Sequence, residues 1–125
     1  MNNILQAELI ENIQKIQKDF LKIKKYLLKD SIKSGSVSKM LFFISYLHGC
    51  SVKTINRFGG DILVYAILNA PSVGCRLEMV DILLRLGASP NHKCITNGIT
   101  PIIASVIMKD VKVYELLLFN GALFA

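Results

Sequence analysis

The features of a secreted or membrane-spanning protein are absent from these 125 residues. The longest apolar runs, around Met40–Leu47 and Ile62–Leu68, fall far short of the ~18 residues that cross a bilayer. The first residues include acidic side chains where a signal peptide carries lysine or arginine, so we expect no secretory leader. Cys50, Cys75 and Cys94 are odd in number and form no C-x-x-C pair. We therefore expect reduced thiols in the cytoplasm, of the protein's own cell or of a host cell.

Motifs that support catalysis are equally scarce. The acidic residues are scattered, and the sequence has neither a phosphate-binding glycine-rich loop nor a G-x-S-x-G elbow. We therefore expect no enzymatic activity and no cofactor. His48, Cys50, His92 and Cys94 could supply four zinc ligands if their two loops met. Zinc sites usually show tighter ligand pairs, so we expect no metal site either.

The composition is apolar for a small protein, and its charge is unevenly distributed. Hydrophobic residues make up 52% and charged residues 19%, with a mean hydropathy of +0.44. This predicts one domain with a substantial core, and some apolar surface covered by a partner or a second copy. The net charge is +6, and residues 1–60 hold ten Lys and Arg against four Asp and Glu, whereas residues 61–125 hold five of each. The basic surplus therefore lies in the first half.

Residues 4–30 are predicted to form one long amphipathic helix, which ends in the polar stretch Ser31–Ser38 around Gly35. Its apolar residues recur at spacings of 4, 3, 4, 3 and 4, which is a heptad seam. These residues, called the seam below, are Leu9, Ile13, Ile16, Phe20, Ile23 and Leu27. Lysines recur on the opposite face, called the basic face: Lys15, Lys18, Lys22, Lys25 and Lys29.

Each face of this helix allows more than one role. We expect the seam to pack on the repeat stack as an N-terminal cap, with helical self-association as the alternative. The basic face could simply be solvated, or it could bind an acidic partner or nucleic acid through charge. It has no aromatic residues on which bases could stack. Adsorption to an anionic membrane is a further alternative.

Residues 36–125 are predicted to be helical as well, because no run alternates apolar and polar residues as a strand would. We expect an all-α fold. One helix is expected near 40–47, followed by two pairs, 62–69 with 77–86 and 101–108 with 112–119. In the last pair Thr100 is a helix-capping residue, Pro101 suits the first helical position and Gly98 allows the preceding turn.

The second helices of these pairs are internally repeated. Residues 80–88 (VDILLRLGA) match residues 114–122 (YELLLFNGA), and the helix-ending glycines Gly49, Gly87 and Gly121 lie 38 and 34 residues apart. Each of the first two is followed 11 residues later by a loop glycine, Gly60 or Gly98. Such regularity indicates stacked units.

These motifs resemble the ankyrin repeat family, most clearly in Gly98-Ile-Thr-Pro-Ile102 and in Leu116–Ala122. The middle unit departs from the pattern, with Ile62-Leu63 in place of Thr-Pro and about four extra residues within 69–76. The resemblance implies about 2.5 degenerate repeats over residues 36–125, with breaks near Gly60 and Gly98, preceded by the helix in residues 1–35.

The resemblance also implies a function, since ankyrin repeats typically bind proteins, including host proteins when they occur in viruses and intracellular bacteria. Loop tips and the first helix of each pair form the binding surface. Arg57 and Phe58 are the strongest candidates, because arginine and aromatic residues dominate binding hot spots. The implied contact residues are Arg57, Phe58, Asp61, Asn69, Thr96, Asn97, Ile99, Ile107 and Met108.

The end of the chain suggests a second contact surface. Repeat arrays generally need a terminal unit with a polar outer face, and none follows the helix stop at Gly121. We expect Leu123 and Phe124 to cover only part of the uncovered helix flank. The C-terminal face would then contact a second copy, a partner or further chain that this sequence does not include. The last helix pair carries apolar residues of which one set must face the preceding unit and the other is left uncovered: Ile102, Ile103, Val106, Ile107, Val111, Val113, Leu116 and Leu117.

Overall fold

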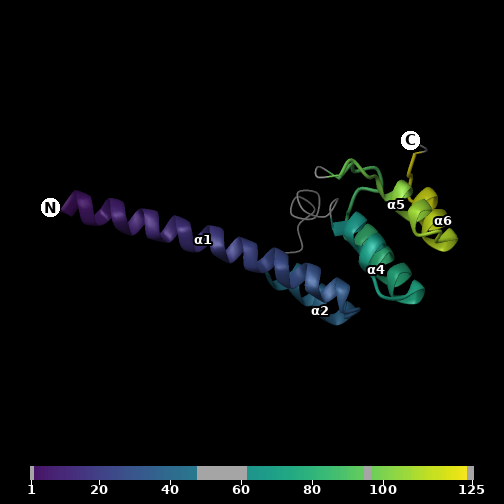
Figure 1. The fold of residues 1–125 in the computed structure, drawn as a ribbon, viewed down its shortest axis with the longest axis horizontal. Coiled ribbons are helices and arrows are strands. Elements are labelled where there is room, and N and C mark those ends of the chain that lie inside the picture. Colours follow the sequence, from purple (N-terminus) through teal and green to yellow (C-terminus); the bar gives the residue numbers. More distant parts are fainter. Residues whose placement is uncertain (1, 48–61, 95–96, 124–125) are drawn as a thin grey trace.

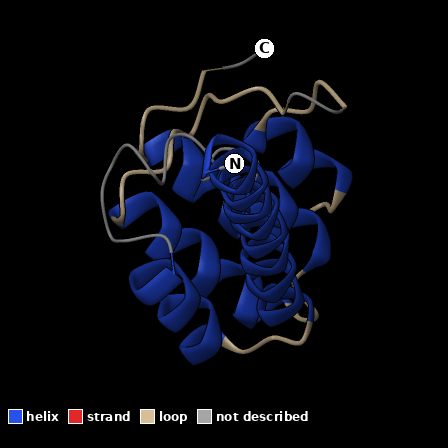
Figure 2. Cartoon of the chain, turned by 90° about the vertical axis from the view of Figure 1, so that its left-hand side faces the viewer, coloured by secondary structure: helices blue, strands red, loops and turns tan. Residues whose placement is uncertain are grey.

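The computed structural model describes residues 2–47, 62–94 and 97–123, and within these ranges every regular element is a helix. The elements are α1 (Asn2–Lys33), α2 (Val37–Phe42), a π-helical segment η1 (Phe43–Leu47), the helix of residues 62–69, α4 (Val73–Arg85), α5 (Pro101–Ile107) and α6 (Val111–Phe119) (Figure 1). The view along α1 likewise shows helices and loops alone (Figure 2). The predicted all-α class is confirmed for these residues.

Helix α1 runs outward from the rest of the molecule, and only its C-terminal turns are packed (Figure 1). Leu28 and Ile32 are buried, and this end of α1 contacts α2 and η1. The seam residues Leu9 to Ile23 are each 46% exposed or more, and Leu27 is half-buried. The expectation that the seam packs on the repeats as a cap was therefore wrong for its first five residues.

The turn after α1 explains why the helix leaves the body. Gly35 has a φ of +80°, which reverses the chain so that α2 packs beside the last turns of α1. The Cys75 thiol donates a 3.5 Å hydrogen bond to the Gly35 carbonyl and ties the turn to α4. Burial raises the pKa of this thiol, Glu78 raises it further and Arg76 opposes the rise, so the donor stays protonated at neutral pH.

Side-chain caps begin both helices of the last pair, α5 and α6, close to the predicted starts. The Thr100 hydroxyl accepts a hydrogen bond from the Ile103 N–H at 3.3 Å, and Pro101 occupies the first helical position, as predicted. Asp110 caps α6 by accepting from the Val113 N–H. Each cap satisfies a backbone donor that has no partner inside its helix.

Helix α4 begins at Val73, four residues before the start that the sequence suggested. Ser72 caps it by accepting from the Cys75 N–H at 3.2 Å. The extra residues of the middle unit therefore form an additional helical turn instead of a longer loop. The predicted start at Leu77 was wrong because the Ser72 capping signal was overlooked.

Four helices end in the same way. A residue with positive φ follows each of α1, α4, α5 and α6: Gly35, Gly87, Lys109 and Gly121. At α4 the N–H of Ala88 donates to the Leu83 carbonyl, and at α6 that of Ala122 donates to the Leu117 carbonyl, 34 residues later along the chain. This Schellman arrangement satisfies the last carbonyls of each helix. The predicted left-handed conformation of Gly121 is confirmed, whereas Gly49 and Gly60 lie outside the described residues.

A single apolar cluster joins the helices from the end of α1 to α6. Its fully buried members come from successive elements, among them Ile32, Met40, Leu63, Leu83 and Leu117. The second helices of the two pairs, α4 and α6, are in direct contact. Five residues of the helix 62–69 are buried, and Ala70 directly after it is buried as well. This helix therefore forms the centre of the core.

Candidate partner-binding surface

A pocket on the helix 62–69 gathers residues from three parts of the chain. Its volume is about 190 Å³, and it is bounded by α1, this helix and the loop before α5. The lining residues are Lys29, Val64, Tyr65, Leu68, Asn69, Cys94 and Asn97. Asn69 and Asn97 were predicted as partner contacts and Lys29 as part of the basic face, so the structure brings these three together.

Local hydrogen bonds hold the two asparagines of the pocket. The Asn69 side-chain amide donates to the Tyr65 carbonyl one turn earlier, at 3.0 Å. The Asn97 side-chain oxygen accepts from the Ile99 N–H at 3.0 Å, which stabilises the turn before α5. Asn97 is nevertheless exposed, and Asn69 is half-buried. Both side chains are therefore held in place by the protein itself, and their remaining polar atoms at the rim of the pocket can bind a partner.

Two backbone contacts shape the loop that carries Asn97. The Cys94 N–H donates to the Ile99 carbonyl at 2.9 Å, and the Gly98 N–H donates to the Cys94 carbonyl at 2.8 Å. Gly98 has a φ of +69°, as the predicted turn requires. A Cβ at this position would lie 3.4 Å from the Lys93 Cε, so the loop also packs closely at its tip.

The charge of the pocket comes from α1. The Lys29 ammonium lies over the Tyr65 ring, 5.3 Å from its centroid. Such a cation–π contact positions the lysine while leaving it available to an anionic group. Tyr65 was not among the predicted contact residues, because only the tertiary arrangement places α1 beside the helix 62–69.

The other predicted contact residues divide into three groups. Ile107 is 52% exposed, which leaves it accessible to a partner. Ile99 and Met108 are partly buried against the core, so packing explains much of their apolar character. Arg57, Phe58, Asp61 and Thr96 lie outside the described residues.

The basic face of α1 is accessible along its length. All five predicted lysines are exposed: Lys15, Lys18, Lys22, Lys25 and Lys29. None of the described helices is long and apolar enough to span a membrane. Within the described ranges no group of three or more His, Cys, Asp or Glu side chains could hold a metal, and His48 and Cys50 lie outside them.

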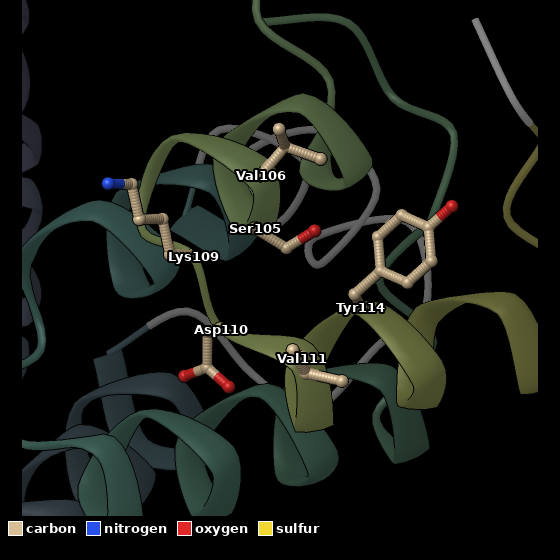
Figure 3. A pocket seen from close by; sticks show the side chains of 6 residues that line it. All are labelled: Ser105, Val106, Lys109, Asp110, Val111 and Tyr114. Carbon is tan, nitrogen blue, oxygen red and sulfur yellow. The ribbon is translucent and has the colours of Figure 1, made fainter.

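A second pocket, of about 240 Å³, lies on the last helix pair (Figure 3). Ser105 and Val106 come from α5, Lys109 and Asp110 from the link, and Val111 and Tyr114 from α6. Val106 and Val111 are 60% and 66% exposed, which fits the expected C-terminal face.

Other apolar residues of the last helix pair are internal. Val113 and Leu117 of α6 are fully buried, and Ile102 of α5 is nearly so. These three therefore belong to the set that faces the core, where α6 contacts α4. Leu123 is 72% exposed and covers little, although its N–H donates to Asn91 at 2.8 Å. Phe124 lies outside the described residues.

Comparison with known proteins does not identify a relative of this chain. Models of known protein families, curated proteins and solved structures were all compared with the chain, and none of them matches it.

Proposed function

We propose that this chain is a small protein-binding module of ankyrin type, without enzymatic activity. The supporting observation is the pocket that joins Lys29, Asn69 and Asn97 on one surface of helical pairs. Positions 83–88 and 117–122, 34 residues apart, end their helices with the same hydrogen bonds, which supports the repeat character. A solenoid of this kind binds through loop tips and first helices, which are the elements that line the pocket.

The lining of the pocket suggests the chemistry of the partner. Lys29 offers a positive charge, the two asparagines offer amide groups, and Leu68 with Tyr65 offers apolar contact. We expect a protein segment with an acidic side chain beside an apolar one. The apolar side chain would supply affinity, and the acidic one would set the orientation.

Site-specific photo-crosslinking tests this proposal. A photoreactive phenylalanine analogue would replace Lys93, which is exposed and directly precedes the pocket residue Cys94. The same analogue at Lys112, exposed in the first turn of α6, is the matched control. In a cell extract the first position should yield a specific protein adduct that the second does not. Equal labelling at both positions, or at neither, would contradict the proposed surface.

The exposed basic face supports a second candidate, in which α1 docks on nucleic acid or an anionic membrane and the repeats act as a scaffold. The changes Lys18→Glu, Lys22→Glu and Lys25→Glu together should then abolish retention on heparin and on anionic liposomes. Raising the salt concentration should weaken retention of the unaltered chain. Retention that the triple variant preserves would remove this candidate.

A further inference from the structure

The apolar stripe of α1 has no counterpart among the residues that the structure describes. Body contacts begin at Leu28, Ser31 and Ile32, which are 3%, 1% and 0% exposed. The preceding seam residues, from Leu9 to Ile23, extend beyond the body along the projecting part of the helix (Figure 1). No described element covers this stripe, and its side chains are accessible to a second chain.

The charges beside the seam indicate which partner fits. In the heptad set by the seam, Leu9, Ile16 and Ile23 take position d, and Ile13 and Phe20 take position a. Position g then falls on Asp19 and position e on Lys24. In a parallel coiled coil, a g residue faces the e residue five positions later on the other helix. Asp19 of one copy would face Lys24 of the other, twice in a symmetric pair.

The antiparallel arrangement is less favourable. In the antiparallel register that pairs most seam residues, Ile16 lies opposite Phe20 of the other copy. In this register each g position lies next to a g position of the other helix. Asp19 would then face Asp19 of the second copy, with like charges in contact. The lysines of the basic face occupy the outward c and f positions in either case, so they do not oppose assembly at the seam.

We propose that α1 self-associates with a second copy of this chain as a parallel coiled coil through Leu9 to Ile23, with Asp19 and Lys24 paired between copies. Lys24 now lies over the Phe20 ring of its own chain, 5.1 Å from the centroid. On association Phe20 enters the seam, and the Lys24 ammonium can turn towards Asp19 of the other copy. The proposal is independent of the binding pocket, which lies at the other end of α1.

Sedimentation velocity of the full chain over a range of concentrations tests the self-association. The unaltered chain should sediment as a dimer that dissociates on dilution. Ile16→Lys, in the seam, should give a monomer, whereas Gln14→Lys adds the same charge outside the seam and should leave the dimer intact. A chain that stays monomeric at every concentration overturns the proposal. Binding of that monomer to phosphatidylserine vesicles, lost in Ile16→Lys, would assign the stripe to a membrane and also overturn it.

Charge exchange tests the parallel orientation. Lys24→Asp places two repelling pairs in a parallel dimer and should raise its Kd roughly tenfold. Lys22→Asp, the matched control on the outward face, should change Kd much less. The double variant Asp19→Lys with Lys24→Asp restores the opposite charges and should recover the original Kd. If Lys24→Asp has no larger effect than Lys22→Asp, or if the double variant is not rescued, the parallel arrangement is wrong.

Discussion

Arg76 and Asp110 form an ion pair in the interior, with the Arg76 Nη1 atom 2.9 Å from an Asp110 carboxylate oxygen. The two side chains are only 7% and 2% exposed. They are 34 residues apart, the same interval that separates Gly87 from Gly121. Arg76 lies in the first turn of α4, and Asp110 is the capping residue of α6. The ion pair thus bonds α4 directly to the start of α6.

Loss of Asp110 should be among the most damaging single changes. Asp110→Ala removes the cap of α6 and leaves the Arg76 charge buried without its partner, which costs about 3–5 kcal/mol of unfolding free energy. Adding Arg76→Met removes that charge, so the double variant should lose only about 1–2 kcal/mol, mostly from the cap. Urea denaturation followed by circular dichroism measures both values.

The exposed ion pair of α4, Arg85 with Asp81, provides the control for these Asp110 and Arg76 variants. Arg85 and Asp81 are 3.2 Å apart, with side chains 78% and 38% exposed. Asp81→Ala should cost less than about 1 kcal/mol. If Asp110→Ala costs no more than Asp81→Ala, the buried pair does not link α4 to α6 as described.

Lys109 should be replaceable by glycine with a gain in stability. It has a φ of +54° after α5, at the position that glycine takes after α1, α4 and α6. Relief of about 1–2 kcal/mol of backbone strain, offset by about 0.5–1 kcal/mol of added chain entropy, leaves a net gain of up to about 1.5 kcal/mol. Thermal unfolding of Lys109→Gly should show this gain. Lys109→Ala keeps the strain, and an equal gain in that variant would refute the explanation.

Two glycines with similar backbones should respond differently to alanine. Gly35 and Gly121 have φ values of +80° and +92°, so both changes cost about 1–2 kcal/mol in strain. A Cβ on Gly35 would also lie 2.8 Å from the Pro71 Cγ, whereas one on Gly121 would meet nothing within 4 Å. Gly35→Ala should therefore lower the urea midpoint more than Gly121→Ala. The reverse order would show that the turn after α1 is not packed on Pro71.

Neighbouring valines of α6 distinguish its buried and exposed sides. Val113 is fully buried, so Val113→Glu should cost at least about 3 kcal/mol by placing an unpaired charge in the core. Val111 is 66% exposed, and Val111→Glu should change stability by no more than about 0.5 kcal/mol. Chemical denaturation gives both values. Similar losses in the two variants would mean that the C-terminal face is not open.

The elements that the sequence predicted well are those with a local physical signal. Thr100-Pro101 determines a helix start through one cap and one fixed φ, and Gly121 determines a helix stop through its left-handed conformation. The predicted start of α4 was four residues too late, although Ser72 carries a comparable capping signal. Local chemistry was the better guide at that position.

The features that the sequence did not reveal depend on contacts between distant residues. The heptad spacing of α1 is compatible with intramolecular packing and with self-association, and only the tertiary contacts show which turns of α1 meet α2 and η1. Tyr65 joins the candidate site because Lys29 of α1 lies over its ring. The sequence around Arg76 likewise does not reveal that Asp110 is its partner. The two residues are 34 positions apart, and a buried ion pair leaves no recognisable local sequence motif.

The central claim is that the pocket of Lys29, Asn69 and Asn97 binds a protein. The most direct measurement is titration calorimetry of the full chain with the protein identified by crosslinking at position 93. Lys29→Glu should weaken binding by at least tenfold, about 1.4 kcal/mol, because the expected acidic contact becomes repulsive. Lys112→Glu, with the same charge change outside the pocket, should leave the affinity unaltered. Equal affinities for the Lys29→Glu variant and the unaltered chain would contradict the assignment of this pocket.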